Sequence, residues 1–471
     1  MAPSSRCAHE LTSRKKIERI TTLMAFIKTA TPKQLSSKLV EVWATPQCSI
    51  TDVRILLTLG ANPALLYEND YGNKTLADRV DAGSVCTSCE AKFQHFLEMA
   101  TELYNVQFHS TPIEVNNGST NDRTKKDNLT SDLIAMSLDG GGMRGLVSVV
   151  CLLFTSRRLF GDESLVDKVD WLVGCSTGAM LSLALAKGFT LTETFFLYWE
   201  MKNEIFLDKS TMARLFGSVV DKQTNRMNEV LKRCFPCEDD TFQNCARRLT
   251  VPALNIARTP AKLHTFRNYP IKVDGGTTSE NGEEHISFRD AARASSAAPT
   301  YFHPHTMAED EIFVDGSLVA NCPLNILFRE FDKSIQAGKD ISLGCVISIG
   351  TGEPNETKRR YKSGNTLHKK GKYLRDMAVL LMEQVVGHEK SVIECTEDRC
   401  AAAAIPFFRI CPTGIDVRID QIDDGKLMDM IWETLLYLLK NVHIIDNLGS
   451  TLKAVAERPH DSPRLRSHTV Q

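Results

Sequence analysis

The chain of 471 residues contains no run of about 18 apolar residues, the length that a helix needs to cross a bilayer. It also lacks an excess of positive charge, because 56 Lys and Arg against 58 Asp and Glu give a formal net charge of −2. Nucleic-acid-binding domains are typically basic, so the charge argues against that class. A hydrophobic content of 42% with 24% charged residues is instead typical of a soluble globular protein.

The 14 cysteines show no framework of disulfide pairs, and residues 1–6 lack the apolar core of a signal peptide. Both features predict a cytoplasmic protein with free thiols. Cys86–Cys89 and Cys234–Cys237 have zinc-ligand spacing, but nothing in the sequence brings them together, and free thiols acting as small apolar groups explain them as well. No calcium-loop pattern of alternating aspartates occurs. We therefore expect no metal and no cofactor.

Residues 174–178, Gly-Cys-Ser-Thr-Gly, stand between a short β-prone segment, 169–173, and a helix-forming one, 179–186. Gly-x-Ser-x-Gly in this position is typical of a nucleophile elbow, in which the serine occupies a strained turn between small neighbours. The pattern predicts Ser176 as a nucleophile, with Gly174 and Gly178 as the glycines of the elbow.

A second glycine motif, Asp-Gly-Gly-Gly-Met-Arg-Gly at 139–145, follows the apolar segment 134–138 and precedes a helix-length apolar segment. Consecutive glycines can expose several backbone N–H groups beside the positive end of a helix dipole, which favours an anion such as the oxyanion of an acyl transfer. Residues 140–145 also match the dinucleotide pattern G-x-G-x-x-G, although the acidic residue expected after the next strand is not evident.

Asp315 and Gly316 follow a short β-prone segment, 311–314. An aspartate at a strand end can reach the end of a neighbouring strand. If the parallel strand that leads to Ser176 is that neighbour, Asp315 accepts the proton of the serine. The alternative is an ordinary solvated Asp-Gly turn.

In kind and in order, the three motifs resemble those of the patatin-like phospholipase family. Five further segments are similar to its calcium-independent, group VI phospholipase A2 branch: Phe266–Tyr269, Ala291–Phe302, Ala320–Pro323, Ser348–Gly352 and Met430–Thr434. The similarity covers roughly residues 131–455. Two small residues depart from the family pattern, since Cys175 replaces a threonine and Ser317 replaces a glycine or alanine.

The resemblance implies an α/β fold, a patatin-like three-layer α/β/α hydrolase core. It implies Ser176 as nucleophile and Asp315 as general base, without a histidine. A serine hydroxyl is too weakly acidic to attack an ester unless a neighbouring base takes its proton. The implied oxyanion site consists of four residues: Gly140, Gly141, Gly142 and Arg144. His264, His303 and His305 are the nearest candidates for a third catalytic group, and we expect them to be ordinary surface or strand residues.

The amino-terminal part, residues 8–110, is expected to be a small helical, ankyrin-like region. Residues 52–63 resemble the second helix and turn of an ankyrin repeat, and residues 71–78 resemble the start of the next. A stable stack needs at least three repeats, so this region should pack on the catalytic domain, a protein partner or a second copy. Residues 111–130 are polar and predicted to be a linker, 131–455 the catalytic domain and 456–471 a polar tail.

The combined expectation is a calcium-independent phospholipase A2-type acyl hydrolase. It would be cytoplasmic and would act peripherally on a glycerophospholipid membrane surface. Lysophospholipase or triacylglycerol hydrolase activity is one alternative, and a membrane-docking interaction module with little catalysis is another. The aromatic segment 195–207 is predicted to be a buried covering helix rather than a lid. The basic segment 358–372 is either a contact for anionic lipid or a solvated loop.

Overall fold

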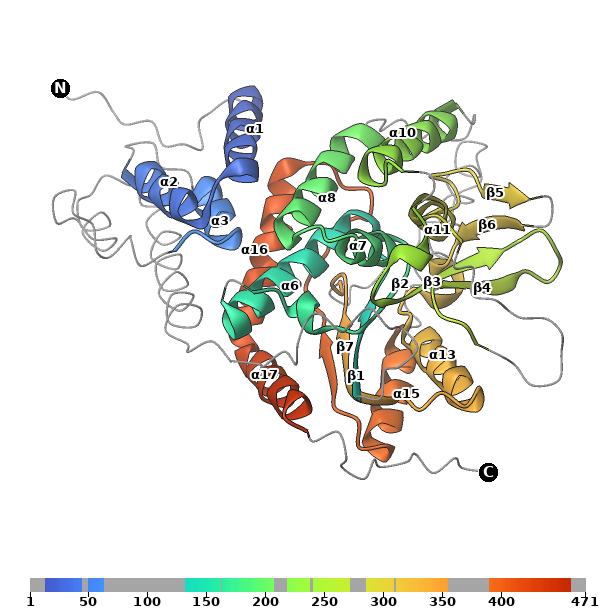
Figure 1. Cartoon of the computed structure of the whole chain (residues 1–471). Coiled ribbons are helices and arrows are strands. Elements are labelled where there is room, and N and C mark those ends of the chain that lie inside the picture. Colours follow the sequence, from blue (N-terminus) through green and yellow to red (C-terminus); the bar gives the residue numbers. More distant parts are fainter. Residues whose placement is uncertain are drawn as a thin grey trace, which may run out of the picture.

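The computed structural model describes residues 13–44, 50–62, 132–161, 163–206, 218–237, 240–271, 285–308, 311–354 and 389–458. Within these residues, eight strands form one sheet in the order β5-β6-β3-β2-β1-β7-β8, with β4 also paired to β3 (Figure 1). The strands are β1 (Asp132–Leu138), β2 (Trp171–Gly174), β3 (Arg248–Asn255), β4 (Lys262–Arg267), β5 (His305–Ala308), β6 (Glu311–Asp315), β7 (Ser342–Ile349) and β8 (Phe407–Ile410).

Helices cover both faces of the sheet. The amino-terminal helices are α1 (Ser13–Thr29), α2 (Pro32–Ala44) and α3 (Ile50–Thr58). Those that follow are α6 (Gly145–Phe160), α7 (Thr177–Ala186), α8 (Leu191–Ile205), α10 (Ser218–Cys234), α11 (Phe288–Ser295), α12 (Ser317–Ala320), α13 (Leu324–Gln336), α15 (Glu389–Ala402), α16 (Asp424–Lys440) and α17 (Val442–Ala456). Short 3₁₀ helices are η4 (Gly142–Arg144), η5 (Leu165–Lys168) and η6 (Phe242–Asn244).

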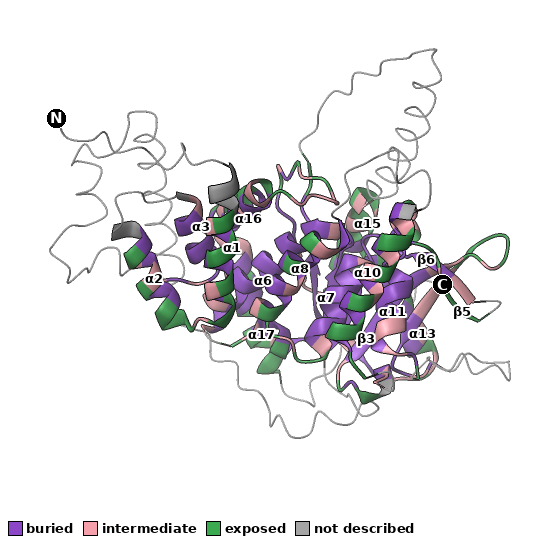
Figure 2. Cartoon of the chain, turned by 90° about the horizontal axis from the view of Figure 1, so that it is seen from above, coloured by how far each residue is buried: buried purple, intermediate pink, exposed green. Residues whose placement is uncertain are grey.

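The apolar side chains of β1 point alternately to the two faces of the sheet, and this explains the three layers. Ile134 and Met136 face a core shared with α6, α7, α8 and α16, whereas Leu133 and Ala135 face a second core shared with α13. A strand with apolar residues on both faces must be covered twice, so helices lie on both sides of the sheet. The buried residues accordingly concentrate at the centre of the molecule (Figure 2). The predicted three-layer α/β/α core is confirmed.

Two strands share one edge of β3. On that edge β2 runs parallel to β3, with Val173 opposite Thr250, and β6 runs antiparallel to it, with Asp315 opposite Ala253. The other edge of β3 is occupied by β4 over the same stretch. The strands β2 and β6 therefore approach each other end to end. The condition set for Asp315 was that the strand leading to Ser176 ends beside it. The structure meets this condition end to end, because β6 is antiparallel to β3 and continues the position of β2 along it.

The amino-terminal helices pack against α6, α8 and α16 (Figure 1). The half-buried guanidinium of Arg157, in α6, donates to the main-chain oxygens of Thr58 (2.9 Å) and Leu59 (2.8 Å) at the end of α3. Helix α3 overlaps the first ankyrin-like segment, whereas the second, 71–78, and the predicted linker lie outside the described residues. The ankyrin-like interpretation and the domain boundaries stay predictions.

The aromatic segment forms α8. Phe195, Phe196, Tyr198 and Trp199 are all buried, which supports a core helix rather than a lid. The basic segment 358–372 lies outside the described residues. In the part of the chain that the structure describes, none of the helices is both long and apolar enough to cross a bilayer.

Candidate active site

Ser176 occupies a strained turn between β2 and α7. Its backbone has φ 53° and ψ −118°, in a region that residues with a side chain rarely adopt. A Cβ added at Gly174 would lie 2.2 Å from the carbonyl oxygen of Gly178, and one added at Gly178 would lie 2.1 Å from that of Leu138. Only glycine fits at both positions, so the sequence pattern follows from the close approach of helix and strands.

The side chain of Ser176 contacts that of Asp315 directly. The Ser176 hydroxyl donates to Asp315 Oδ2 over 2.7 Å, and the backbone N–H of Ser317 donates to Asp315 Oδ1 over 2.8 Å. Asp315 is 1% exposed, whereas Ser176 is partly exposed. The two predicted residues are therefore brought together, with the serine open to a substrate and the carboxylate held behind it.

Burial raises the pKa of Asp315 to about 6, and hydrogen bonds from Ser176 and Ser317 partly oppose this shift. A carboxylate with a pKa near 6 is still ionised at neutral pH and is a stronger base than an ordinary surface carboxylate. The environment of Asp315 therefore suits a general base for the hydroxyl of Ser176.

Helix α11 joins the elbow to the strand that carries the aspartate. Ser295 Oγ accepts the backbone N–H of Ser176 (3.0 Å) and donates to the carbonyl oxygen of Pro252 (2.7 Å). The N–H of Asp315 donates to the oxygen of Ala297 over 3.0 Å. From the sequence, Ser295 was only a reserve candidate for the nucleophile, in the small-residue segment that supported the family resemblance, and its role in holding the elbow was not predicted.

The glycine loop lies against the elbow. A Cβ on Gly140 would be 3.3 Å from the Cβ of Ser176, and the hydroxyl of Thr177 donates to the oxygen of Gly142 over 3.0 Å. The predicted oxyanion site needs one correction: the N–H of Gly140 donates to the main-chain oxygen of Asn321 (2.9 Å) and is occupied. Among the described residues, the N–H groups of Gly141 and Gly142 have no such acceptor and remain as candidate oxyanion donors.

Arg144 holds the loop from behind. Its side chain is buried, and Nη1 donates to the carbonyl oxygen of Gly352 over 3.2 Å. Burial lowers the pKa of the guanidinium, and the nearby carboxylate of Glu389 opposes this shift. The contact observed for Arg144 is thus with the loop after β7.

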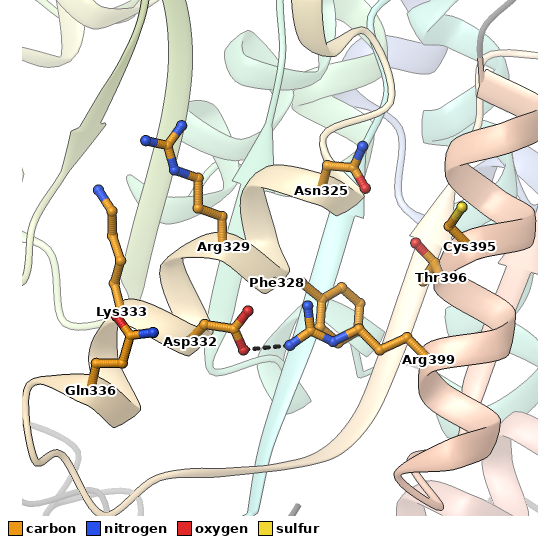
Figure 3. Close-up of a pocket in the computed structure, with 9 residues that line it drawn as sticks. All are labelled: Asn325, Phe328, Arg329, Asp332, Lys333, Gln336, Cys395, Thr396 and Arg399. Atoms are coloured by element: carbon orange, nitrogen blue, oxygen red, sulfur yellow. Dashed lines mark hydrogen bonds and ion pairs between the residues drawn. The ribbon is translucent and has the colours of Figure 1, made fainter. Parts of the chain in front are cut away.

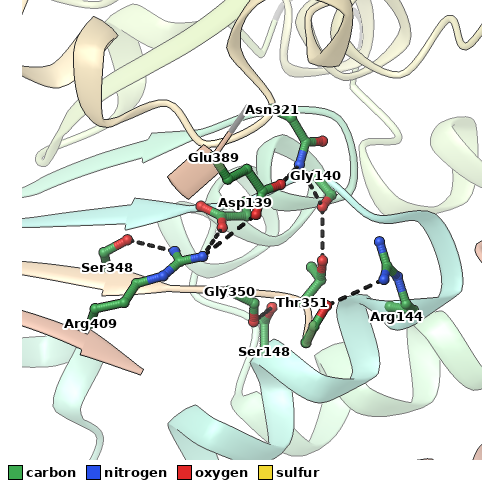
Figure 4. A network of polar contacts seen from close by, with 11 residues as sticks. Asp139, Gly140, Arg144, Ser148, Asn321, Ser348, Gly350, Thr351, Glu389 and Arg409 are labelled. Atoms are coloured by element: carbon green, nitrogen blue, oxygen red, sulfur yellow. Dashed lines mark hydrogen bonds and ion pairs between the residues drawn. The ribbon is translucent and has the colours of Figure 1, made fainter. Parts of the chain in front are cut away.

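A buried polar network lies beside the glycine loop (Figure 4). Arg409 is 2.7 Å from Asp139 Oδ2 and 3.7 Å from Glu389 Oε2, and it donates to Ser348 Oγ over 2.8 Å. Burial and the charge of Asp139 together raise the pKa of Glu389 to about 8, against the opposing charge of Arg409. Two carboxylates share one guanidinium here. No sequence motif pointed to Glu389 or Arg409.

The three histidines considered as a third catalytic group all make other contacts. The ring of His264 packs against Phe266 and Phe313, at centroid distances of 4.6 and 5.1 Å. His303 lies 2.7 Å from Asp221, and His305 lies 2.9 Å from Asp290. These contacts fit the expectation that the dyad works without an imidazole.

A cavity of about 480 Å³ lies between α13 and α15, apart from the dyad (Figure 3). It is lined by Asn325, Phe328, Arg329, Asp332, Lys333, Gln336, Cys395, Thr396 and Arg399. Arg399 bridges the two helices, because it pairs with Asp332 and stacks 4.5 Å from the ring centre of Phe328. No predicted site residue borders this cavity, and we assign it to the packing of the two helices.

Of the two cysteine pairs at zinc-ligand spacing, only one can be placed. Cys234 ends α10 and Cys237 is exposed, while Cys86 and Cys89 lie outside the described residues. Within the described ranges, no three His, Cys, Asp or Glu side chains gather in a way that could hold a metal ion.

A serine on a strained strand-to-helix turn, hydrogen-bonded to a buried carboxylate and flanked by a glycine loop, defines a site of the serine hydrolase class. Residues 136–328 match the family described as patatin-like phospholipase, and this interval contains Ser176, Asp315 and the loop at 140–142. This part of the chain is therefore similar to the patatin-like phospholipase domain.

The chain is also similar to several proteins that are named phospholipases. The chain is 27% identical over 371 residues to an intracellular phospholipase A2 of Caenorhabditis elegans, covering 77% of this chain and 32% of that protein. It is 27% identical over 330 residues to the 85/88 kDa calcium-independent phospholipase A2 of Mus musculus, covering 65% and 39%. It is 30% identical over 227 residues to a cGAMP-activated phospholipase of Escherichia coli (strain TW11681), covering 46% and 61%. The chain thus spans about a third of the length of the two animal relatives.

Proposed function

We propose that this chain hydrolyses the acyl esters of glycerophospholipids, as a phospholipase A2-type enzyme that needs no calcium. The observation that carries the proposal is the 2.7 Å hydrogen bond from Ser176 Oγ to the buried carboxylate of Asp315. The patatin-like match over residues 136–328 and the names of the relatives support the choice of a phospholipid ester.

The first half of the reaction forms an acyl-enzyme. Asp315 takes the proton of the Ser176 hydroxyl while Oγ attacks the ester carbonyl. The charge that develops on the carbonyl oxygen is stabilised by backbone N–H groups, for which Gly141 and Gly142 are the candidates. When the ester bond breaks, the protonated Asp315 returns its proton to the departing oxygen of the glycerol backbone, and a lysophospholipid leaves.

The second half repeats these steps with water. Asp315 accepts a proton from a water molecule, whose oxygen attacks the acyl group on Ser176. The intermediate collapses, the proton goes back to Ser176 Oγ, and a free fatty acid leaves. A carboxylate base suffices because the leaving group is an alcohol oxygen, which is easier to expel than an amide nitrogen.

The test compares the wild-type chain with Ser176→Ala on phosphatidylcholine vesicles, with fatty acid and lysolipid measured by mass spectrometry. We expect fatty acid release from the wild type, also in excess chelator, and none above background from the variant. Equal release from both would move the nucleophile away from Ser176, and complete loss in chelator would overturn the calcium-free mechanism.

The same products separate the alternatives. A lysophospholipase would release fatty acid only from added lysolipid, and a neutral-lipid hydrolase would act on triacylglycerol in preference to phosphatidylcholine. An interaction module would bind the vesicles without Ser176-dependent turnover. The intact dyad and glycine loop speak against the last, because a protein that only binds does not need the strained conformation of Ser176.

We further propose that the chain is cytoplasmic and binds membranes peripherally, since its proposed substrate is part of a bilayer. Vesicle flotation and cell fractionation test this, and recovery of all the protein in a compartment without access to phospholipid would contradict it. The ankyrin-like amino-terminal region is proposed to contact a protein partner or a second copy of the chain. Light scattering of the purified chain tests the second possibility directly.

A further inference from the structure

Two segments that resemble the family have no part in the mechanism so far. They are Ala320–Pro323, after the aspartate, and Ser348–Gly352, at the end of β7. Both reach the glycine loop at the same peptide. The carbonyl oxygen of Gly140 accepts hydrogen bonds from Thr351 Oγ1 (2.9 Å) and from Asn321 Nδ2 (3.4 Å). The main-chain oxygen of Asn321 in turn accepts the N–H of Gly140 (2.9 Å).

These contacts determine where the next N–H group points. In a planar trans peptide, the C=O of one residue and the N–H of the following residue point in opposite directions. Thr351 and Asn321 hold the carbonyl of Gly140, so the N–H of Gly141 is turned to the opposite side of that peptide. Gly140 itself lies against Ser176, as its close approach to the Cβ of the serine shows.

We call the hydrogen bonds from Thr351 and Asn321 to the oxygen of Gly140 the clamp, and the side chains that form it are tightly packed. Asn321 and Thr351 are each 4% exposed. A Cβ on Gly140 would lie 2.4 Å from Asn321 Oδ1, and one on Gly141 would lie 2.3 Å from Thr351 Oγ1. The loop therefore packs directly on both side chains, and their donor atoms cannot move far without moving the Gly140–Gly141 peptide.

Asn321 is itself held in place. Its Nδ2 also donates to Glu389 Oε1, and Glu389 lies beside Arg409, which pairs with Asp139 at the start of the glycine loop (Figure 4). Glu389 Oε1 accepts one hydrogen of Asn321 Nδ2, and this fixes the side-chain amide so that its other hydrogen is directed to the oxygen of Gly140. The network thus connects β8 and α15 to the orientation of one peptide.

We propose that Thr351 and Asn321 are positioning residues of the oxyanion site, which orient the Gly140–Gly141 peptide so that the N–H of Gly141 stabilises the transition state. The inference rests on the proposed function, because it concerns the charge that forms during ester attack. It gives the two segments a shared role, since each supplies one donor to the carbonyl of Gly140.

The test uses a matched pair at one position. Thr351→Val keeps the shape of the side chain and loses the donor, whereas Thr351→Ser keeps the donor and loses a methyl group. Turnover of a soluble p-nitrophenyl ester, the affinity for a trifluoromethyl ketone that forms a tetrahedral adduct with the serine, and the affinity for a non-hydrolysable ether lipid are measured for each. Circular dichroism and thermal unfolding establish that each variant is folded.

Deletion of an oxyanion donor costs about 100-fold or more in kcat, and we expect a misdirected donor in Thr351→Val to cost roughly tenfold. KM and the affinity for the ether lipid should stay within about twofold of the wild type, because they report the ground state, and the ketone should bind about tenfold more weakly. Thr351→Ser should retain most of the turnover. If Thr351 only supported the fold, its substitution would lower turnover, both ligand affinities and stability together.

Equal turnover in Thr351→Val and Thr351→Ser would overturn the inference, as would a loss shared equally by the ketone and the ether lipid. If Thr351→Val does not fold, Asn321→Leu removes the second donor while it keeps the main-chain oxygen that binds Gly140. Wild-type turnover in Asn321→Leu, or a loss shared equally by the ketone and the ether lipid, would then overturn the inference. A wild type without Ser176-dependent turnover would refute the proposed function instead, so the two failures are distinguishable.

Discussion

Ser176 and Asp315 meet because the strands that carry them approach each other along one edge of β3. Val173, near the end of β2, lies opposite Thr250, and Asp315, at the end of β6, lies opposite Ala253. The turns that follow β2 and β6 therefore lie on either side of Pro252 and face each other. As a proline, this residue has no N–H to leave unpaired in the gap, and its oxygen is bonded by Ser295. The dyad is thus a product of sheet topology.

The raised pKa of Asp315 predicts the pH dependence of hydrolysis. The base must be ionised to take the proton of Ser176, so kcat/KM on a soluble ester should fall about tenfold per pH unit below a midpoint near 6. A pH-rate profile between pH 4 and 9 measures this midpoint. A midpoint near 4, the ordinary value for an aspartate, would show that burial does not control this carboxyl.

The same shift predicts a gain in stability for Asp315→Asn. Burial raises the pKa from 3.8 to about 6, so the folded chain binds a proton in that interval and the unfolded chain does not. The favourable contribution is complete below pH 3.8 and is lost as the pH rises through 6. An amide cannot ionise, so at pH 7.5 the variant should be more stable by about 1–3 kcal/mol, although almost inactive.

Urea unfolding of both proteins at pH 7.5 and at pH 4 measures this difference, which should narrow at the lower pH. A variant that is less stable than the wild type at pH 7.5 would mean that the hydrogen bonds of the carboxylate outweigh its desolvation.

Gly178→Ala should destabilise the fold. Its new Cβ would lie 2.1 Å from the carbonyl oxygen of Leu138, and backbone on both sides would have to move, at a cost of roughly 1–3 kcal/mol. Gly425→Ala, in the first turn of α16, is the control, because the nearest atom is a side-chain oxygen at 3.2 Å. Thermal unfolding of both variants compares them, and equal melting temperatures would contradict the elbow packing.

Arg157→Leu should loosen the amino-terminal helices without changing the chemistry. It leaves the main-chain oxygens of the buried Thr58 and Leu59 without their donor, at a cost of about 1–3 kcal/mol. Arg158→Leu is the control, since its ion pair with the half-exposed Asp446 is worth about 1 kcal/mol or less. Limited proteolysis between α3 and α6 should accelerate in the first variant only, with soluble-ester turnover preserved in both. Loss of turnover in folded Arg157→Leu would tie the amino-terminal helices to the active site.

Sequence patterns predicted those features of the site that depend on neighbours along the chain. The strand before Ser176, the helix after it and the need for glycine at 174 and 178 all follow from one local turn, and the structure has each of them. Patterns did not predict Glu389 and Arg409, because a lone charged residue on a helix or strand has no signature until its burial is known. They also suggested three free N–H groups in the glycine loop, where Asn321 occupies one.

The amino-acid sequence by itself determined the local geometry of this protein. A glycine or a strand-helix boundary constrains the backbone within a few residues, and such constraints are written in adjacent positions. Only the tertiary structure decided which ends meet, because the edge of β3 that β2 and β6 share brings together residues 139 positions apart. The proton acceptor of Ser176, the raised pKa of Asp315 and the clamp on Gly140 depend on burial and contact between distant segments, which packing of the whole sheet alone creates.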